Sequence, residues 1–489
     1  MAEGVSHSAG LRLRSSERRV ILLIGDLLAS ILAVLGAVYS WFQYSWYALL
    51  ASGISPAKAI KIFPSVDIII KEIIPFWFYL LPLGWLLLMV ELNEPHVATN
   101  WRRTLRGITI AAFIGLVAYS LVFITIREPN SLPRIGVGAF LLLASLLTLG
   151  WRSLYIRLYT SQGLMRRALV VGAGKAGRTL VQEYKKLTPP PFQLVGYIDD
   201  DPHKAGKSFE GYPVLSSSNR LLRAVEQQKV SDLIIAITGE MRGSTFQTIL
   251  DVQERGVEIT RMPTVYEEMM GRVPVHHLES DWVIRSFVDE ARVSGIYELI
   301  KRLLDILGAL VGMGILALIF PFAALATLID SGLPILYSQT RLGKGGKTFV
   351  IHKFRTMCQD AEADGKARLA MENDPRVTRV GNFLRRTRLD EFPQFWNVLH
   401  GEMSLVGPRA ERAELVEEFQ KQIPFYRTRL LVKPGITGWA QVNYGYVSTV
   451  YDTTVKLEYD LYYIKHRTLF RDIAIMLRTI GPVLSGRGR

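Results

Sequence analysis

The sequence predicts a multi-domain membrane protein. Its expected parts are an N-terminal α-helical transmembrane bundle, a central α/β Rossmann-like domain with a parallel sheet, and a mainly α C-terminal domain with a re-entrant membrane helix. Apolar runs fill the first 150 residues, strands alternate with helices around a glycine-rich turn in the next hundred, and a fifth apolar run precedes a basic C-terminal third. A chain of 489 residues is long enough for two or three domains. We place the parts at residues 1–160, 161–265 and 297–489, with a connector at 266–296.

Composition limits the class of partner. The net charge is +14 and 49% of the residues are hydrophobic, which is typical of a membrane protein with positive cytoplasmic flanks or of a protein with an anionic ligand. Nucleic acid is not expected as a partner, because the sequence has neither a Cys/His zinc spacing nor a basic helix interleaved with aromatic residues. The single cysteine, Cys358, excludes an intrachain disulfide.

Four apolar runs predict the transmembrane bundle. They cover residues 20–39, 73–90, 105–126 and 135–150, and each is near the roughly 20 residues that cross a bilayer. Buried helices of a soluble core are the alternative, although four such runs in series favour membrane spans. Arginines gather before the first run, between the second and third, and after the fourth. The positive-inside rule therefore places the N-terminus and everything after residue 150 in the cytoplasm.

A glycine-rich turn marks the central domain. Residues 167–177 read as strand, turn and helix, and further strands are expected at 193–199, 231–238 and 257–262, an alternation typical of a parallel sheet. The three glycines of the motif G-x-G-x-x-G are Gly172, Gly174 and Gly177. Acidic residues follow the second strand at about the distance expected for a dinucleotide site. Two interpretations stay open: a nucleotide such as NAD at the helix N-terminus, or a close-packed turn without a ligand.

The fifth apolar run covers residues 303–329 and contains Asp305 and Pro321. Basic residues follow it directly, and such flanks resist translocation. Because proline in a helix interior removes a hydrogen bond and kinks the axis, we expect a re-entrant helix over about residues 299–330 that bends at Pro321 and returns to the same face. Asp305 is expected to pair with Arg302, since a lone charge in lipid is costly. An ordinary fifth span is the alternative.

Two adjacent carboxylates, Asp390 and Glu391, follow Arg385, Arg386 and Arg388. Neighbouring cations keep an aspartate ionised and attract a polyanion. An ionised aspartate can attack phosphorus covalently, and a second carboxylate can hold a divalent cation or move a proton. The pair therefore indicates chemistry on a phosphate. A solvated helix of salt-bridged charges is the alternative.

Four blocks of sequence carry a resemblance to a known family: K-F-R-T-M at 353–357, D-E-F-P-Q at 390–394, S-L-V-G-P-R at 404–409 and K-P-G-I-T-G-W-A-Q-V at 433–442. Over about residues 296–484 the chain resembles the bacterial sugar transferase family, the polyprenyl-phosphate phosphoglycosyl transferases with a single re-entrant membrane domain. Two positions depart from the family pattern: Ala410 stands where a proline is frequent, and Phe320 where a serine often precedes the helix-breaking proline.

The resemblance implies a reaction. A UDP-sugar donates its sugar-1-phosphate to undecaprenyl phosphate through a covalent phosphosugar-aspartyl enzyme, with Mg²⁺, and UMP is released. The N-terminal spans and Rossmann-like domain resemble the long subfamily, which initiates exopolysaccharide, O-antigen or capsule assembly. This implies a multi-pass protein of the bacterial inner membrane with cytoplasmic soluble domains. A homodimer is left open.

The resemblance and the local charges assign the site residues. Asp390 is expected to be the nucleophile and Glu391 to support the metal or the proton, with both carboxylates near Mg²⁺. Helical spacing places two arginines within reach of this dyad. The expected phosphate- or nucleotide-binding residues are Lys353, Arg355, Arg385, Arg388 and Arg409. A structural salt bridge is the alternative for each of them.

Two rival functions are a membrane-anchored NAD-dependent sugar-nucleotide oxidoreductase and a non-catalytic polysaccharide-export scaffold. The first lacks a clear Tyr-x-x-x-Lys partner in the Rossmann-like segment, and the second predicts that Asp390 is dispensable. The sequence leaves the transferred sugar open. A chain beginning near Ser294 is expected to keep some activity, because the catalytic blocks and the membrane helix lie after it and are self-contained.

Overall fold

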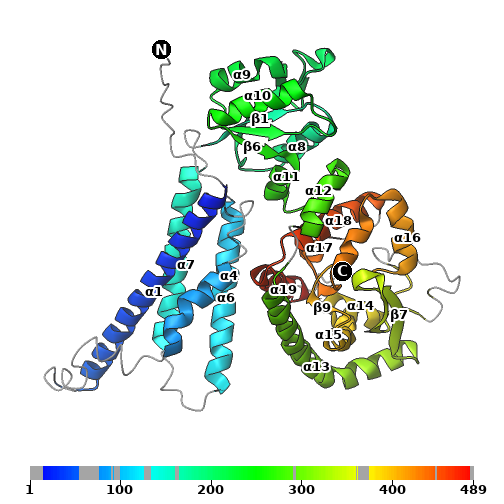
Figure 1. Cartoon of the computed structure of the whole chain (residues 1–489). Helices are drawn as coiled ribbons and strands as arrows, with labels where there is room; N and C mark the ends of the chain where they lie inside the picture. Colours follow the sequence, from blue (N-terminus) through cyan, green and yellow to red (C-terminus); the bar gives the residue numbers. More distant parts are fainter. Residues whose placement is uncertain are drawn as a thin grey trace. The chain divides into compact units, whose positions relative to one another are not determined.

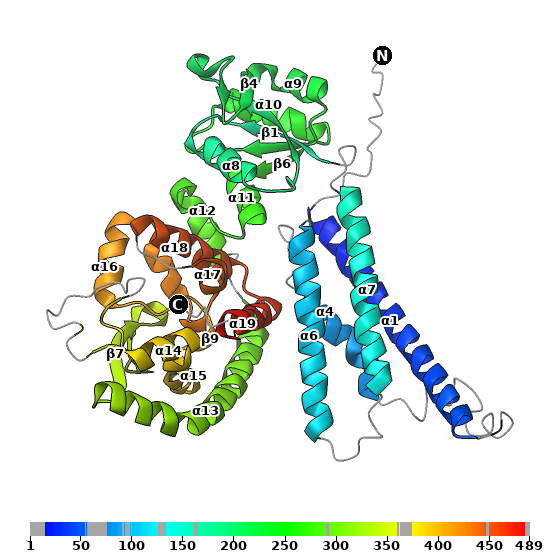
Figure 2. The same cartoon turned by 180° about the vertical axis from the view of Figure 1, so that it is seen from behind.

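The computed structural model describes residues 15–53, 76–89, 100–125, 134–159, 165–289, 293–358, 374–445 and 449–484, with single positions at 55, 92, 98 and 361. The chain forms two compact units (Figures 1 and 2). The first contains Met1–Ile237 and Met241–Met262, and the second contains Thr238–Glu240 and Pro263–Arg489.

The first unit begins with a helical bundle. Its helices are α1 (Ser15–Ala51), η2 (Phe76–Leu80), α4 (Leu81–Met89), α6 (Trp101–Thr125) and α7 (Arg134–Tyr159). Alanines on the inner face of α1, including Ala33 and Ala37, are fully buried and allow close helix packing. A fully buried ion pair joins α7 to α1, with Arg152 Nη2 2.5 Å from Asp26 Oδ2. A charge inside an apolar bundle needs such a partner, because an unpaired one is strongly disfavoured.

Three described helices are long and apolar enough to cross a membrane: Glu17–Ala48, Arg134–Leu158 and Gly295–Ser331. They indicate membrane association and correspond to the first, fourth and fifth predicted runs. The second run is represented by the shorter apolar helix Phe76–Met89, and its outer residues lie outside the described part of the chain. The third falls on α6. Membrane crossing by these two segments stays a prediction.

The rest of the first unit is a six-stranded sheet in the order β3-β4-β2-β1-β5-β6. Its strands are β1 (Arg167–Val171), β2 (Gln193–Ile198), β3 (Ser208–Phe209), β4 (Tyr212–Ser216), β5 (Asp232–Ile235) and β6 (Glu258–Arg261). In Figures 1 and 2, α9 (Leu221–Gln228) and α10 (Gly243–Glu254) lie above the sheet and α8 (Lys175–Lys185) lies below it. The four predicted strands and the Rossmann-like alternation are confirmed.

The prediction of a purely parallel sheet is wrong at one edge. Strand β3 pairs antiparallel with β4, while the other pairings are parallel. Glu210 and Gly211, the two residues between β3 and β4, both have positive φ values, 54° and 86°. A two-residue turn of this kind joins only antiparallel neighbours. The sheet is therefore mixed. The β3–β4 hairpin was not predicted, because its strands are too short to show a periodic pattern in the sequence.

The second unit is organised around α13 (Gly295–Ser331), which contains Pro321. Its ribbon changes direction part-way along in both views (Figures 1 and 2). The expected pairing of Asp305 with Arg302 is wrong. Asp305 Oδ1 accepts hydrogen bonds from Ser404 Oγ and Leu405 N, both at 2.9 Å. The buried carboxylate thus anchors the helix to the protein's own backbone.

The remaining elements surround α13. Strands β7 (Leu336–Leu342) and β8 (Thr348–Phe354) form an antiparallel hairpin, and β9 (Ser404–Val406) pairs parallel with β10 (Gly435–Thr437). The helices are α14 (Arg379–Thr387), η10 (Leu389–Gln394), α15 (Phe395–His400), α16 (Ala413–Gln422), η11 (Tyr426–Leu431), α17 (Trp439–Asn443), α18 (Val450–Lys465) and α19 (Leu469–Leu484).

The segment expected to be a connector packs into this unit. It contains most of α11 (Met262–Met270) and all of α12 (Ser280–Ile284). Val273, Val275, Trp282 and Phe287 belong to the same buried cluster as residues of α16 and α18. Trp439 Nε1 also donates to the carbonyl oxygen of Gly271 at 2.8 Å. The segment from Val273 to Phe287 therefore shares a core with α16 and α18.

These contacts change the expectation for a shortened chain. A chain beginning at Pro263 is expected to fold and keep activity in detergent, whereas one beginning at Ser294 should unfold at lower temperature, because it lacks four buried apolar side chains of the core. Each such loss typically costs about 2–5 kcal/mol. Thermal unfolding and transferase assays of both chains would check this. Equal stability of the two would contradict it.

Candidate active site

The site forms where three segments of the second unit meet. Strand β8 supplies Lys353, η10 supplies Asp390 and Glu391, and the loop after β9 supplies Arg409. Both carboxylates are only 8% exposed. The alternative of a solvated, salt-bridged helix is therefore excluded.

A sharp turn at Arg388 presents the two carboxylates. Helix α14 ends at Thr387, and Arg388 adopts a left-handed conformation with φ 57° before η10 begins. A non-glycine residue in this region stores backbone strain, which is common at functional sites. The expectation that Arg385 shares one continuous helix with the dyad is therefore wrong, because two different helices flank the turn.

Glu391 is the electrostatic centre of the site. Its Oε1 lies 2.7 Å from both Lys353 Nζ and Arg409 Nη2, and its Oε2 lies 3.8 Å from Arg388 Nη1. Burial alone would raise the pKa of Glu391, but the charges of Arg409, Lys353 and Arg388 outweigh it and hold that pKa well below its usual range. Glu391 is therefore an anion that fixes the position of the surrounding cations.

Asp390 is in the opposite situation. Among the described residues, no group donates a hydrogen bond to its carboxylate. Burial and the negative charge of Glu391 raise the pKa of Asp390 to about 6, against the lowering effect of Lys353, Arg385 and Arg409. A carboxylate with open lone pairs, surrounded by cations, suits nucleophilic attack on an anionic phosphate.

Arg385 and Arg388 lie beside the dyad, as the sequence suggested. Arg385 Nε donates to Thr356 Oγ1 at 2.9 Å, and burial lowers the pKa of Arg385 while the nearby Asp390 raises it. The Nε atom of Arg388 is buried without a hydrogen-bond partner among the described residues. Both guanidinium groups therefore retain donor capacity near the carboxylates.

Arg355 has a different environment from the other predicted phosphate ligands. Its guanidinium donates to carbonyl oxygens at the C-terminal end of α13: Ser331 O at 2.5 Å, Leu333 O at 2.9 Å and Gly332 O. These carbonyls lack partners within the helix, so a cation there stabilises the helix end. The contacts favour the structural alternative for this residue.

Sequence reasoning gave no role to Gln394, although it lies in the same block as the dyad. Gln394 is 5% exposed, and its Nε2 has no hydrogen-bond partner among the described residues. A buried unpaired donor is unusual in a folded protein. In the sequence, only its position four residues after Asp390 could have indicated that Gln394 lies at the site.

The residues present are compatible with Mg²⁺. This ion takes one or two protein carboxylates and completes its coordination with water and substrate phosphate oxygens. Asp390 has unoccupied acceptor positions among the described residues. The oxygens of Glu391 face Lys353, Arg409 and Arg388. Asp390 is therefore the better candidate ligand of the two.

The glycine turn of the Rossmann-like sheet is tightly packed. Gly172 has a φ of +107°, and a Cβ atom on Gly177 would lie 2.0 Å from the carbonyl oxygen of Gly172. Asp199 Oδ2 accepts a hydrogen bond from Ala173 N at 2.7 Å, so this carboxylate ties the turn to the end of β2. There is open space around Gly174. Nucleotide binding at this turn stays a prediction.

Two family models match the chain. Residues 296–486 match the bacterial sugar transferase family, and residues 96–263 match a CoA-binding domain. A Xanthomonas campestris pv. campestris protein named UDP-glucose:undecaprenyl-phosphate glucose-1-phosphate transferase is 30% identical over 77% of this chain and 79% of its own length. The chain belongs to the bacterial sugar transferase family.

Other members of the family differ in the sugar that they are named for. An Escherichia coli (strain K12) relative, named UDP-glucose:undecaprenyl-phosphate glucose-1-phosphate transferase, is 33% identical over 64% of this chain and 67% of its own length. An Aeromonas hydrophila relative, named UDP-N-acetylgalactosamine-undecaprenyl-phosphate N-acetylgalactosaminephosphotransferase, is 41% identical over 47% of this chain. The chain covers 53% of the length of that protein.

Proposed function

We propose that this chain is an undecaprenyl-phosphate glycosyl-1-phosphate transferase. It transfers the sugar-1-phosphate of a UDP-sugar to undecaprenyl phosphate, releases UMP and so initiates assembly of a bacterial surface polysaccharide. The observation that carries the proposal is the buried Asp390–Glu391 dyad among Lys353, Arg385 and Arg409, inside the segment that matches the family. The names of the relatives support the two substrates.

The reaction consists of two displacements at one phosphorus. A carboxylate oxygen of Asp390 attacks the phosphorus next to the sugar, the bond to the bridging oxygen breaks, and UMP leaves with the electron pair. A phosphate oxygen of undecaprenyl phosphate then attacks the same phosphorus, and the aspartyl oxygen leaves as a free carboxylate. Catalysis of such transfers rests on positioning and charge neutralisation.

The cations of the site have distinct roles in this scheme. The side chain of Arg409 is 38% exposed, so its guanidinium is accessible to the donor diphosphate, while Lys353 is more deeply placed at 17% exposure. Glu391 pairs with both Lys353 and Arg409, which holds two positive charges beside Asp390. Mg²⁺, when bound at Asp390, would neutralise charge on the phosphate oxygens.

The most direct test is a donor screen. The purified enzyme with undecaprenyl phosphate should release UMP from at least one member of a panel containing UDP-glucose, UDP-galactose and N-acetylated UDP-sugars. The donor that gives the highest kcat/KM identifies the sugar. Failure to release UMP from any of them would overturn the proposed reaction.

We place the site at the cytoplasmic face of the bacterial inner membrane, with α13 as a re-entrant helix. Its apolar side chains are widely exposed, for example Leu318 at 75% and Phe322 at 76%, which suits contact with lipid. Pro321 lies within this helix. A lipid acceptor and a soluble, charged donor must meet at the membrane surface, and a re-entrant helix achieves this without moving the C-terminal domain across.

Cysteine labelling tests this topology. Ser294→Cys and Ser338→Cys, each in a Cys358→Ser background, flank the helix at exposed positions. Both should react only with reagents that reach the cytoplasm, because the two ends of a re-entrant helix share one face. Pro321→Leu should restore a backbone hydrogen bond, favour a straight span and lower activity. Reaction of Ser338→Cys from outside in the otherwise native protein would exclude the re-entrant arrangement.

A further inference from the structure

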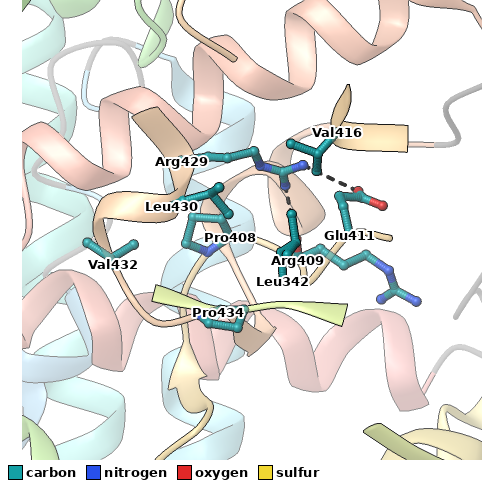
Figure 3. A pocket seen from close by; sticks show the side chains of 10 residues that line it. Leu342, Pro408, Arg409, Glu411, Val416, Arg429, Leu430, Val432 and Pro434 are labelled. Carbon is teal, nitrogen blue, oxygen red and sulfur yellow. Dashed lines mark hydrogen bonds and ion pairs between the residues drawn. The ribbon is translucent and has the colours of Figure 1, made fainter. Parts of the chain in front are cut away.

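Arg429 is a buried cation that the proposed reaction does not use. It lies on η11 and is 4% exposed. Its Nη1 donates to Tyr426 Oη at 2.9 Å, and its Nη2 donates to Asp460 Oδ2 at 2.8 Å and to the carbonyl oxygen of Arg409 at 3.1 Å. Figure 3 shows Arg429 at a small pocket that is also lined by Pro408, Arg409 and Glu411.

Arg429 belongs to a buried network of alternating charges. Glu411 accepts from Lys456 Nζ at 2.8 Å and lies 3.4 Å from Arg429 Nη1. Burial would raise the pKa of Glu411, but Lys456 and Arg429 lower it to well below its usual range. A buried network of this kind is costly unless every member is satisfied, and it is more effective at fixing one geometry than at adding stability.

The loop that carries Arg409 has no regular secondary structure, yet four consecutive carbonyl oxygens accept hydrogen bonds. Pro408 O accepts from Gly435 N at 2.9 Å, and Glu411 O accepts from Leu342 N at 3.0 Å. Between them, Arg409 O accepts from Arg429 at 3.1 Å and Ala410 O from Arg341 at 3.3 Å. Side chains therefore fix the loop at the two positions where backbone donors do not.

The fixed carbonyl belongs to the residue whose side chain reaches the dyad. Arg409 Nη2 lies 2.7 Å from Glu391 Oε1. A displacement of the Arg409 backbone would move this guanidinium, and with it the charge that acts on both Glu391 and Asp390. Because Ala410 is not a proline, the backbone after Arg409 is not restricted by a ring, so these external donors set its conformation.

We infer that Arg429 is a positioning residue. By donating to the carbonyl group of Arg409, it keeps the Arg409 guanidinium on Glu391 and in place for the donor diphosphate. The inference deepens the proposed function and rests on it for the identity of the ligand. Arg429 itself contacts neither the dyad nor the reacting atoms. Its effect on the reaction should therefore depend entirely on Arg409.

A double-mutant cycle tests this dependence. Arg429→Gln is expected to lower kcat/KM roughly tenfold to a hundredfold, the effect of losing a buried hydrogen bond from a charged donor. Combining it with Arg409→Gln should add little to the loss caused by Arg409→Gln alone, because the two residues act in series. Independent, multiplicative losses would overturn the inference.

A matched control separates positioning from general stability. Asp460→Asn removes a charge from the same buried network but leaves Arg429 free to donate to Arg409. It should lower the unfolding temperature while keeping kcat/KM within about threefold of wild type, since only the positioning contact affects the reaction. A loss of activity equal to that of Arg429→Gln would show that Arg429 acts through stability alone.

Hydrogen exchange gives a readout that does not need turnover. Backbone amides of residues 404–411 should exchange faster in Arg429→Gln than in wild type, and not in Arg409→Gln. If the wild-type protein turns over no UDP-sugar, the proposed function fails while this measurement still decides the loop contact. If Arg429→Gln does not fold, Arg429→Lys keeps the charge but not the two-armed geometry, and the same faster exchange is expected. Unchanged exchange in the folded variant would overturn the inference.

Discussion

Asp390→Asn is expected to abolish turnover while the fold survives. An amide cannot form the acyl phosphate with the donor, so kcat should fall by at least about a thousandfold, as when the nucleophile of a covalent mechanism is removed. A donor labelled in the phosphate next to the sugar should label the wild-type protein covalently when the lipid acceptor is withheld. The variant should remain unlabelled.

The stability of this variant follows from the pKa of Asp390. Burial raises that pKa to about 6, so the folded state binds the proton more tightly than the unfolded chain, whose carboxyl has an ordinary pKa of 3.8. The folded state therefore loses stability as pH rises through this range, and ionised Asp390 is unfavourable at neutral pH. Asp390→Asn should unfold at the same temperature as wild type or higher.

Asp374→Asn provides the matched control. Asp374 is also buried, but its carboxylate pairs with Arg376 at 2.6 Å. This variant should still become labelled. Normal turnover by Asp390→Asn, or labelling of that variant, would remove Asp390 from the role of nucleophile.

Glu391→Gln is expected to have the second-largest effect. Two cations lie 2.7 Å from Glu391 Oε1, and the amide would leave their charges without a counter-ion. Breaking a buried charge pair from one side typically costs about 3–5 kcal/mol of stability. Because Lys353 and Arg409 would also lose their position, kcat/KM should fall by about a hundredfold or more.

The pH dependence of Glu391→Gln distinguishes this explanation from simple unfolding. Nucleophilic attack needs ionised Asp390, so kcat/KM of the wild type should rise with pH through about 6. The negative charge of Glu391 raises that pKa, and its removal should move the acidic limb to lower pH. Glu402→Gln is a control, because Glu402 accepts from Asn397 and lies outside the dyad. An unshifted limb would contradict the coupling.

Local patterns determined much of this molecule. Apolar length predicted the helices α1, α7 and α13, and the structure contains them as helices long and apolar enough to cross a membrane. The glycine turn and alternating apolar runs predicted the four main strands of the Rossmann-like sheet. The ordered blocks around Asp390 were sufficient for the family. These features depend on residues close together in the chain, so they can be predicted from a single sequence.

Contacts between distant residues were decided only by the tertiary structure. Asp305 pairs with Ser404 and Leu405, about 100 positions away, rather than with its helical neighbour. Arg355 caps α13, while Lys353, two positions earlier, reaches Glu391. Side chains two positions apart in a strand point to the same face. The different partners of these two cations therefore depend on the packing of other segments.

The opposite protonation tendencies of the dyad have the same origin. Asp390 and Glu391 are adjacent and chemically alike, and the sequence alone assigns them similar surroundings. In the folded chain Glu391 forms ion pairs with Lys353 of β8 and with Arg409 of the loop after β9. Asp390 is buried and accepts no hydrogen bond from the described residues. The sequence predicted which groups do the chemistry. The folded structure decided which carboxylate is held by cations and which keeps open acceptor positions, because desolvation and charge contacts arise only when distant segments meet.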